Sequence, residues 1–341
     1  MKHISILLAS LFGLLLLTTS CNDEWKDEQY TQYISFRAPL NDNGVTSCYV
    51  PYTRHNTDGT TKFGEGQSEF DQPVVISGST DNTKDVTVHI AHDADTLGIL
   101  NYARFQNRSE LYYVDMNDFA TYPETLQIGA GTDVGLYNIK FNFKGIDMVN
   151  KYVLPLQILD DNAYGYTSHP RKNYAKAMLR VYPFNDFSGD YSATTLTLGN
   201  SADTNNSPTG LSTVRAYVVD ENTVFFYAGN IDESRVDRAN YKIYARFSGG
   251  TQGSVTLWSE NAKINFKTDG RCTYRVYELA DEVKPYLLHR YVILNNINYS
   301  YSDYTSVVNY QISYTASGTM TLERQLNTQI TDPDWQIVYS E

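Results

Sequence analysis

The stretch Val86-Thr87-Val88-His89-Ile90-Ala91 alternates large apolar side chains with polar or small ones, and it decides the expected fold. Successive side chains of a β-strand point to opposite faces, so the pattern predicts a half-buried strand with one wet face. Residues 139–143 repeat the alternation, whereas residues 152–158 are almost continuously apolar and contain Pro155, which favours a sheet edge or a strand start. Short strands at this spacing, with no helical stretch long enough for parallel crossovers, indicate an Ig-like antiparallel β-sandwich over residues 30–183.

A second domain is predicted after residues 182–189, where Pro, Gly, Asn and Asp end one pattern before another begins. The alternation resumes in three stretches, residues 241–247, 262–266 and 319–323. Residues 259–261 are expected to form a hairpin between two strands, and residues 279–288 a short helical turn. We therefore expect a second antiparallel β domain over residues 184–341, either a sandwich or a barrel, with few contacts across the join.

The composition supports a β-rich chain and excludes one class of partner. The 341 residues include 29 tyrosines and 14 phenylalanines but only 19% charged residues, a mixture that favours strands over helices. The formal net charge of −12 argues against nucleic acid, which proteins hold by neutralising phosphates with Lys and Arg. The sequence has no nucleophile elbow, zinc-protease helix motif or phosphate-binding glycine loop, so we expect no catalytic residues, no cofactor and no enzyme activity.

The N-terminus has the layout of an exported lipoprotein. A charged start, an apolar run over residues 4–17 and three small residues predict a signal peptide over residues 1–20, with an apolar part too short to span a bilayer. Cys21 follows directly and resembles the acylated cysteine of the bacterial lipobox, in the looser version found in Bacteroidota. The alternative is an ordinary signal peptide whose cysteine joins a disulfide.

Residues 21–29 are expected to form an acidic tether. Four side chains resemble the signal that routes such lipoproteins to the outer face of the outer membrane: Asp23, Glu24, Asp27 and Glu28. The resemblance implies a cell-surface protein that touches the membrane only through its lipid anchor. With Cys21 lipidated, Cys48 and Cys272 remain in separate predicted domains, so we expect two free buried thiols.

Several stretches carry a family likeness: Val86-Thr-Val88 with Asp93 and Asp95, Leu100-Asn101-Tyr102, Leu126-Gln-Ile128-Gly129-Ala-Gly131, and Tyr152-Val-Leu-Pro155-Leu-Gln-Ile158. Together they resemble an N-terminal domain of unknown function common in Bacteroidota surface lipoproteins, typified by the module before some family-18 endo-glycosidases. Residues 184–191 and 318–325 resemble a C-terminal β domain that often partners it. The resemblance implies a surface glycan-binding protein of a Sus-type polysaccharide-utilisation system, acting beside an outer-membrane transporter complex.

Sugar binding requires an exposed aromatic ring for the C–H face of the sugar, with amides or carboxylates nearby for its hydroxyls. Trp258 lies opposite in phase to its apolar neighbours and next to a polar turn, although a buried Trp258 is the competing interpretation. Tyr299 and Tyr301 share a face of an extended chain rich in Asn and Ser, although these rings can equally pack on their own strands. The glycan-binding candidates are Trp258, Glu260, Asn261, Tyr299, Tyr301 and Tyr304.

His89 and His92, followed by Asp93 and Asp95, resemble a metal site at first sight. Side chains three apart on a strand point to opposite faces, so the two histidines meet one ion only if the strand breaks between them. Calcium binding by Asp93 and Asp95 remains an alternative to the simpler interpretation, an acidic turn without a metal. We expect no specific metal site.

Three function classes remain open. An outer-membrane surface lipoprotein that binds an oligosaccharide or polysaccharide is the favoured class. It accounts together for the predicted surface location, the two β domains and the family resemblance. A structural or adhesive surface lipoprotein without glycan binding accounts equally well for the predicted surface location and the β content. A glycoside hydrolase built from two carboxylates on distant strands is the third.

Overall fold

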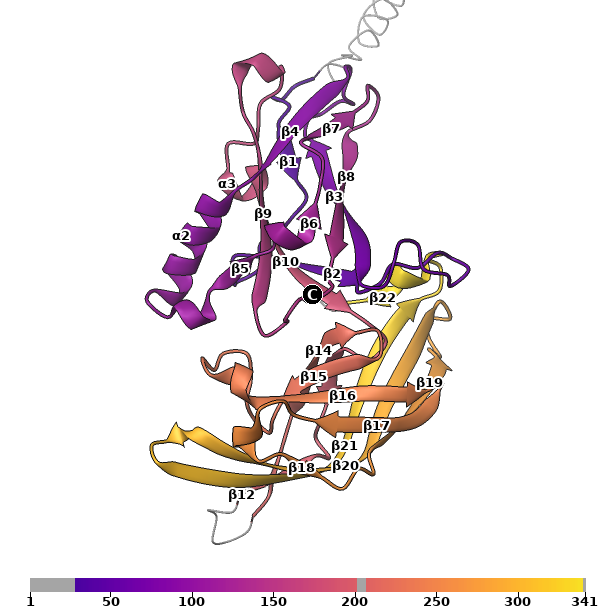
Figure 1. Ribbon diagram of the computed structural model, residues 1–341. Helices are drawn as coiled ribbons and strands as arrows, with labels where there is room; N and C mark the ends of the chain where they lie inside the picture. Colours follow the sequence, from indigo (N-terminus) through magenta and orange to yellow (C-terminus); the bar gives the residue numbers. More distant parts are fainter. Residues whose placement is uncertain (1–27, 201–206, 340–341) are drawn as a thin grey trace, which may run out of the picture.

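The computed structural model describes residues 28–200 and 207–339, which form two β domains (Figure 1). The N-terminal domain is a sandwich of two sheets, and the C-terminal domain is built on one large curved sheet. The predicted all-β fold with two mainly antiparallel domains is confirmed. The predicted signal peptide, together with Cys21, Asp23, Glu24 and Asp27, lies outside the described residues. No helix within the described ranges is both long and apolar enough to cross a membrane.

The sandwich has one sheet in the order β1-β3-β8-β6 and another in the order β2-β10-β9-β4-β7, with β5 beside β9. Its strands are β1 (Ile34–Phe36), β2 (Thr46–Pro51), β3 (Gln67–Ile76), β4 (Val86–His92), β5 (Tyr113–Asp115), β6 (Ala120–Thr121), β7 (Thr125–Ile128), β8 (Val134–Asn142), β9 (Lys151–Ile158) and β10 (Lys176–Phe184). Two pairs are parallel, β2 with β10 and β5 with β9, and the others are antiparallel. Cys48 on β2 is a buried free thiol, as is Cys272 in the second domain, which confirms that prediction.

The alternating stretches fill the sandwich as their sequences predict. Val88 and Ile90 of β4 are buried in one sheet, and Ile139 and Phe141 of β8 are buried in the other. The two sets belong to one apolar cluster between the sheets. Period-2 alternation therefore identified both the strands and the faces that they bury.

Pro155 lies in the middle of its sheet, so the expectation of an edge strand is wrong. β9 pairs with β10 on one side. On its other side, β4 pairs only with residues 156–158, and β5 only with residues 151–153. Pro155 falls in the gap between β4 and β5, where no neighbouring strand requires the N–H that proline lacks.

A 12-residue helix, α2 (Ala94–Phe105), follows β4 and corrects the expectation of a domain without a long helix. The carboxylate of Asp93 caps its first turn by accepting a hydrogen bond from the backbone N–H of Thr96 at 3.2 Å. The same carboxylate forms an ion pair with Lys176 at 2.5 Å. A second, one-turn helix, α3 (Lys172–Ala175), precedes β10.

Helix α2 explains the continuous apolar run in β9. Leu97 on α2 packs in a small cluster with Val153 on β9 and Met178 on β10, so the helix covers the outer face of the sheet (Figure 1). The alternate residues of β9 face the sandwich core. A strand buried on both faces needs apolar side chains at every position.

The C-terminal sheet contains the remaining strands: β11 (Gly189–Ser192), β12 (Thr197–Asn200), β13 (Thr209–Gly210), β14 (Thr213–Asp220), β15 (Thr223–Tyr227), β16 (Lys242–Gly249), β17 (Gln252–Trp258), β18 (Lys267–Thr268), β19 (Thr273–Ala280), β20 (Leu287–Val307), β21 (Tyr310–Asn327) and β22 (Ile337–Val338). Its pairings run β11-β14-β15-β16-β17-β19-β20-β21, and β21 pairs back with β11. The ladder closes on itself, so the barrel alternative describes this domain.

Two local expectations in this domain are wrong. Residues 262–266 contain a 3-10 turn, Ala262–Ile264, instead of a strand, so residues 259–261 do not form a hairpin. Residues 279–288 contain no helix and connect β19 to β20, which pair with each other.

The expectation of few contacts across the join is also wrong. Arg54 of the first domain is only 6% exposed, and its guanidinium forms ion pairs with Asp332 and Asp334 in the C-terminal tail. Arg238 of the second domain is 3% exposed and donates to the backbone carbonyl of Val149 at 2.9 Å. The tail after β21 folds back onto the first domain, which holds the two domains in one arrangement.

Glu28 begins the described chain and is tied to the first domain. Its carboxylate accepts hydrogen bonds from the backbone N–H groups of Ser79 at 2.8 Å and Thr80 at 3.1 Å. These backbone hydrogen bonds hold the pKa of Glu28 well below its usual range. Its predicted part in an export signal stays a prediction.

Candidate functional site

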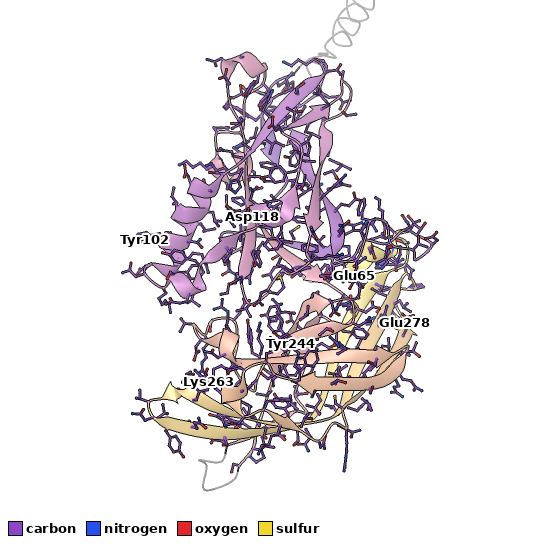
Figure 2. All side chains as sticks on the ribbon, viewed as in Figure 1. Glu65, Tyr102, Asp118, Tyr244, Lys263 and Glu278 are labelled. Carbon is purple, nitrogen blue, oxygen red and sulfur yellow. The ribbon has the colours of Figure 1, made fainter. Side chains whose placement is uncertain are left out.

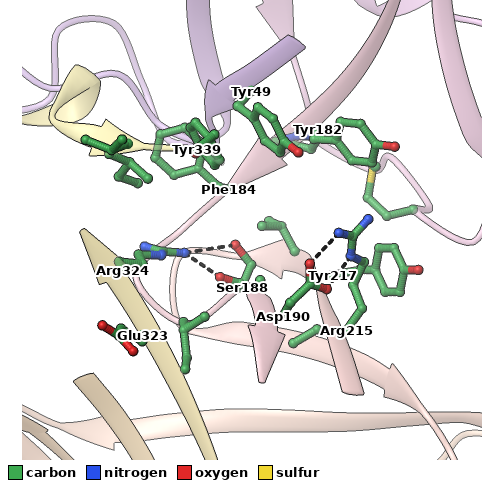
Figure 3. A pocket seen from close by; sticks show the side chains of 18 of the residues that line it. Tyr49, Tyr182, Phe184, Ser188, Asp190, Arg215, Tyr217, Glu323, Arg324 and Tyr339 are labelled. Carbon is green, nitrogen blue, oxygen red and sulfur yellow. Dashed lines mark hydrogen bonds and ion pairs between the residues drawn. The ribbon is translucent and has the colours of Figure 1, made fainter. Parts of the chain in front are cut away.

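A cavity of about 520 Å³ lies where the two domains meet (Figure 3). Its lining comes from the ends of β2 and β10 in the first domain and from β11, β14 and β21 in the second. The C-terminal tail adds a further part of the wall. Concave sites between domains with mixed apolar and polar linings are where small ligands most often bind.

One side of the cavity is an aromatic wall formed by Tyr49, Tyr182 and Tyr339 (Figure 3). Tyr49 and Tyr182 are register partners in the parallel pair β2–β10, so their rings share the face that points away from the sandwich core. Their ring centroids are 5.2 Å apart. The ring of Tyr339 stacks on Tyr49 with 3.7 Å between centroids and an interplanar angle of 7°.

The hydroxyls of Tyr182 and Tyr339 stay protonated at neutral pH. Burial raises the pKa of Tyr182 to about 12 and also raises the pKa of Tyr339 above its usual value. Neutral phenols can both donate and accept hydrogen bonds, so the aromatic wall also offers polar contacts at its edge.

The opposite side carries an ion pair between Asp190 on β11 and Arg215 on β14. These residues are also register partners, which places their side chains on one face. Arg215 Nε donates to Asp190 Oδ1 at 2.6 Å, and Nη2 donates to Oδ2 at 2.5 Å. The hydrogen bonds to Asp190 raise the pKa of Arg215, and its guanidinium lies 5.8 Å from the ring of Tyr182. The pair therefore presents fixed charges beside the aromatic wall.

Arg324 on β21 adds a second guanidinium to this side (Figure 3). Its Nη2 donates to the backbone carbonyls of Asn185, at 2.6 Å, and Ser188. The side chain of Asn185 closes the same turn by accepting from the backbone N–H of Ser188 at 2.9 Å. The predicted join is thus a compact, hydrogen-bonded turn whose carbonyl groups Arg324 caps.

Trp258, the first sequence-predicted candidate, lies outside this cavity. Trp258 is the last of four cross-strand partners on one face of the barrel. In order across the strands, this row consists of Tyr217, Phe225, Tyr244 and Trp258. Trp258 is half-buried, and its ring stacks with 5.1 Å between centroids on that of Tyr244. Figure 2 labels Tyr244 in the second domain. The guanidinium of Arg246 lies 5.3 Å from the Trp258 ring.

Three other candidates gather near Trp258. Glu260 accepts a hydrogen bond from the Tyr244 hydroxyl at 3.2 Å. The side-chain amide of Asn261 donates to the backbone carbonyl of Asn240 at 2.8 Å and lies 3.3 Å from the Tyr304 hydroxyl. The structure therefore brings Trp258, Glu260, Asn261 and Tyr304 into one region, but their polar groups already bind other parts of the protein.

Tyr299 and Tyr301 are in the core, so the expectation of an exposed tyrosine face is wrong. Each is 2% exposed. The hydroxyl of Tyr299 accepts a hydrogen bond from the backbone N–H of Gly229, and the ring of Tyr301 stacks on Tyr314 with 5.2 Å between centroids. The two side chains do share a face of β20, but that face packs inside the domain.

The residues considered for calcium have other partners. Asp93 caps α2 and pairs with Lys176, while Asp95 lies in the first turn of the helix. His92 contacts Asp115 at 2.7 Å, and the ring of His89 stacks on Tyr164. Among the described residues, no three His, Cys, Asp or Glu side chains are grouped so as to hold a metal ion.

Sequence reasoning missed the cavity residues. Tyr182 was noted only as part of the join, and Tyr49, Arg215 and Arg324 stand in ordinary strand positions. The only local signal is the strand parity that puts Tyr182 on the face opposite to its buried neighbours. No local pattern indicates that a residue of β2 faces one of β14.

Two family profiles match successive parts of this chain. A domain of unknown function, DUF4973, matches residues 25–162, and a C-terminal domain profile matches residues 175–321. A Bacteroides thetaiotaomicron protein described as an auxiliary nutrient binding protein is 48% identical, with a TM-score of 0.81 over 91% of this chain and 100% of that one. The chain belongs to the same family as that protein.

Other solved structures from this family come from Bacteroides ovatus. One protein of unknown function is 38% identical, with a TM-score of 0.77 over 90% of this chain and 100% of its own. Another is 32% identical, with a TM-score of 0.75 over 92% of this chain and 97% of its own. Curated protein sequences give no match. These three family members are described as nutrient-binding or of unknown function, and none of them as an enzyme.

Proposed function

We propose that the protein is a cell-surface lipoprotein that binds glycans in the cavity between its domains, as part of a polysaccharide-utilisation system. The observation that carries the proposal is the aromatic wall of Tyr49, Tyr182 and Tyr339 opposite the Asp190–Arg215 ion pair (Figure 3). A sugar ring has an apolar C–H face and a rim of hydroxyls, and this cavity offers a partner for each.

The chemistry of the two sides supports binding of modest strength. An aromatic ring removes apolar sugar surface from water, and fixed charged groups accept from and donate to hydroxyls. A few such contacts supply about 4 to 6 kcal/mol, a dissociation constant between millimolar and tens of micromolar. The family member described as an auxiliary nutrient binding protein supports a binding role of this kind.

The first prediction concerns Tyr182. Tyr182→Ala removes the ring of the aromatic wall that lies next to Arg215, so we expect glycan affinity to fall about tenfold or more. A glycan array followed by calorimetry on the best ligand measures the effect. Tyr182→Phe keeps the ring and serves as the matched control, with affinity within a few-fold of the wild type.

Trp258→Ala discriminates between the two aromatic regions. If the glycan binds in the cavity, this change leaves its affinity unaltered. Tyr217 at one end of the row lines the cavity, whereas Trp258 at the other end does not. Loss of binding in Trp258→Ala with normal binding in Tyr182→Ala would move the site to the barrel surface. Absence of binding to every glycan tested would contradict the proposed function.

The second prediction concerns the anchor. We infer surface attachment from Cys21 and its acidic neighbours, so Cys21→Ala is expected to abolish acylation by removing the acceptor thiol. Radiolabelled palmitate reports the acylation, and protease treatment of whole cells reports exposure. Cys48→Ala is the control, because this buried thiol should leave labelling unchanged. Label in the Cys21→Ala protein would refute the anchor.

A further inference from the structure

Two arginines face each other beside the cavity. Arg290 on β20 and Arg324 on β21 are direct register partners, so their side chains leave the same face of the barrel. Like charges directly opposite each other on neighbouring strands repel and destabilise the pair. Such a pair requires negative charge nearby.

The described residues supply only one free carboxylate to the two guanidinium groups. Asp186 pairs with Arg290 at 3.1 Å. The carboxylate of Glu323 instead contacts His289 at 2.7 Å and the hydroxyl of Tyr291 at 3.2 Å. Asp190 is neutralised by Arg215, as described above. Among the described residues, Arg324 is therefore left without a carboxylate partner.

The hydrogen bonds of the two arginines are also incomplete. Within residues 28–200 and 207–339, Arg324 donates only through Nη2, to the two backbone carbonyls and to the Ser188 hydroxyl at 3.5 Å, and forms no ion pair. Arg290 Nε is buried without a hydrogen-bond partner in the same ranges. Burial lowers the pKa of Arg324, which reflects a guanidinium with too little compensating negative charge. A half-buried guanidinium that contacts carbonyl groups but no carboxylate has its charge only partly compensated, and a ligand anion supplies the missing negative charge.

We propose that the cavity selects acidic glycans, whose anionic group, a carboxylate or a sulfate, binds Arg324 with support from Arg290. This inference rests on the proposed glycan-binding function and adds the class of glycan. The guanidinium fork matches the two oxygens of either anion, and a neutral sugar leaves this charge uncompensated. The aromatic wall then holds the ring of the same sugar or its neighbour.

The test compares each acidic glycan with its neutral form on the wild-type protein. Uronic acid oligosaccharides and their methyl esters, and sulfated oligosaccharides and their desulfated forms, are titrated into the purified full chain. We expect the acidic form to bind about tenfold to a hundredfold more tightly, and the difference to shrink at high salt. Which acidic series binds identifies the anion.

Arg324→Gln is expected to remove this preference. Arg271→Gln, which removes the same charge at an exposed position outside the cavity lining, should leave the preference intact. The comparison of acid and ester in the wild type does not depend on the folding of any variant. Equal binding of acid and ester, or a preference that survives Arg324→Gln, would overturn the inference while leaving glycan binding in place. Absence of binding by neutral and acidic glycans alike would instead remove the proposed function.

Discussion

Tyr301→Ala is expected to reduce the free energy of unfolding by about 3–5 kcal/mol, the range for removing a large buried aromatic side chain. Tyr301 is 2% exposed and packs against Tyr314 and, edge-on, against Tyr241 at 6.4 Å. The change leaves a cavity among rings that cannot close it without moving their strands. Urea unfolding followed by tyrosine and tryptophan fluorescence measures the loss.

Tyr310→Ala is the matched control for this prediction. Tyr310 lies on the partner strand of the same hairpin but is 53% exposed, so its truncation should change the free energy of unfolding by less than about 0.5 kcal/mol. Equal and small effects of both substitutions would mean that Tyr301 does not lie in the core. A glycan-binding role for its ring would then be open again.

The wrong expectation for Tyr299 and Tyr301 shows what the alternation of side chains along a strand can and cannot predict. The sequence indicated that the two side chains share a face, and they do. Parity does not say which face is inside, because that depends on strands far along the chain. Here β20 pairs at Tyr299 with β18 on one side and β21 on the other, and the face that carries the two tyrosines packs inside the domain.

The helix α2 was missed for a different reason. Asp93 was interpreted as part of an acidic turn, whereas it is the N-cap of the helix. Its carboxylate accepts a hydrogen bond from the backbone N–H of Thr96. An Asp directly before the segment is by itself a local capping signal that could have been found. Gly98 lowers the helix propensity of the segment, but it does not prevent the helix, and no other atom lies within 4 Å of the position of an added Cβ.

The cavity is the part of the candidate site that local patterns could not predict. Its aromatic wall joins Tyr49 to Tyr182 through a parallel pair and to Tyr339 through the returning tail. Each side chain is unremarkable in its own strand. The site exists only because contacts between the domains, among them those of Arg54 with the tail and of Arg238 with Val149, fix one domain against the other.

Gly318→Ala is expected to lower the free energy of unfolding by more than about 3 kcal/mol, because two costs add. Gly318 has φ of +144°, a conformation that side-chain-bearing residues rarely adopt and that costs about 1–3 kcal/mol. An added Cβ would lie 2.0 Å from the backbone oxygen of Thr195 and 2.9 Å from Cα of Leu196. Both are backbone atoms, so relief requires a shift of the chain and not of a side chain.

The position of Gly318 explains why the barrel needs this residue. β21 pairs with β11 at residues 321–322 and with β12 at residues 314–317, and Gly318 lies between the two contacts. Gly98→Ala is the control, because it adds a Cβ in open space within α2 and should stabilise the protein by up to about 1 kcal/mol. Thermal unfolding of both variants measures the contrast. A Gly318→Ala protein that melts with the wild type would mean that β21 does not bend tightly over Thr195, and the closed path of strands through β11, β20 and β21 would need to be redrawn.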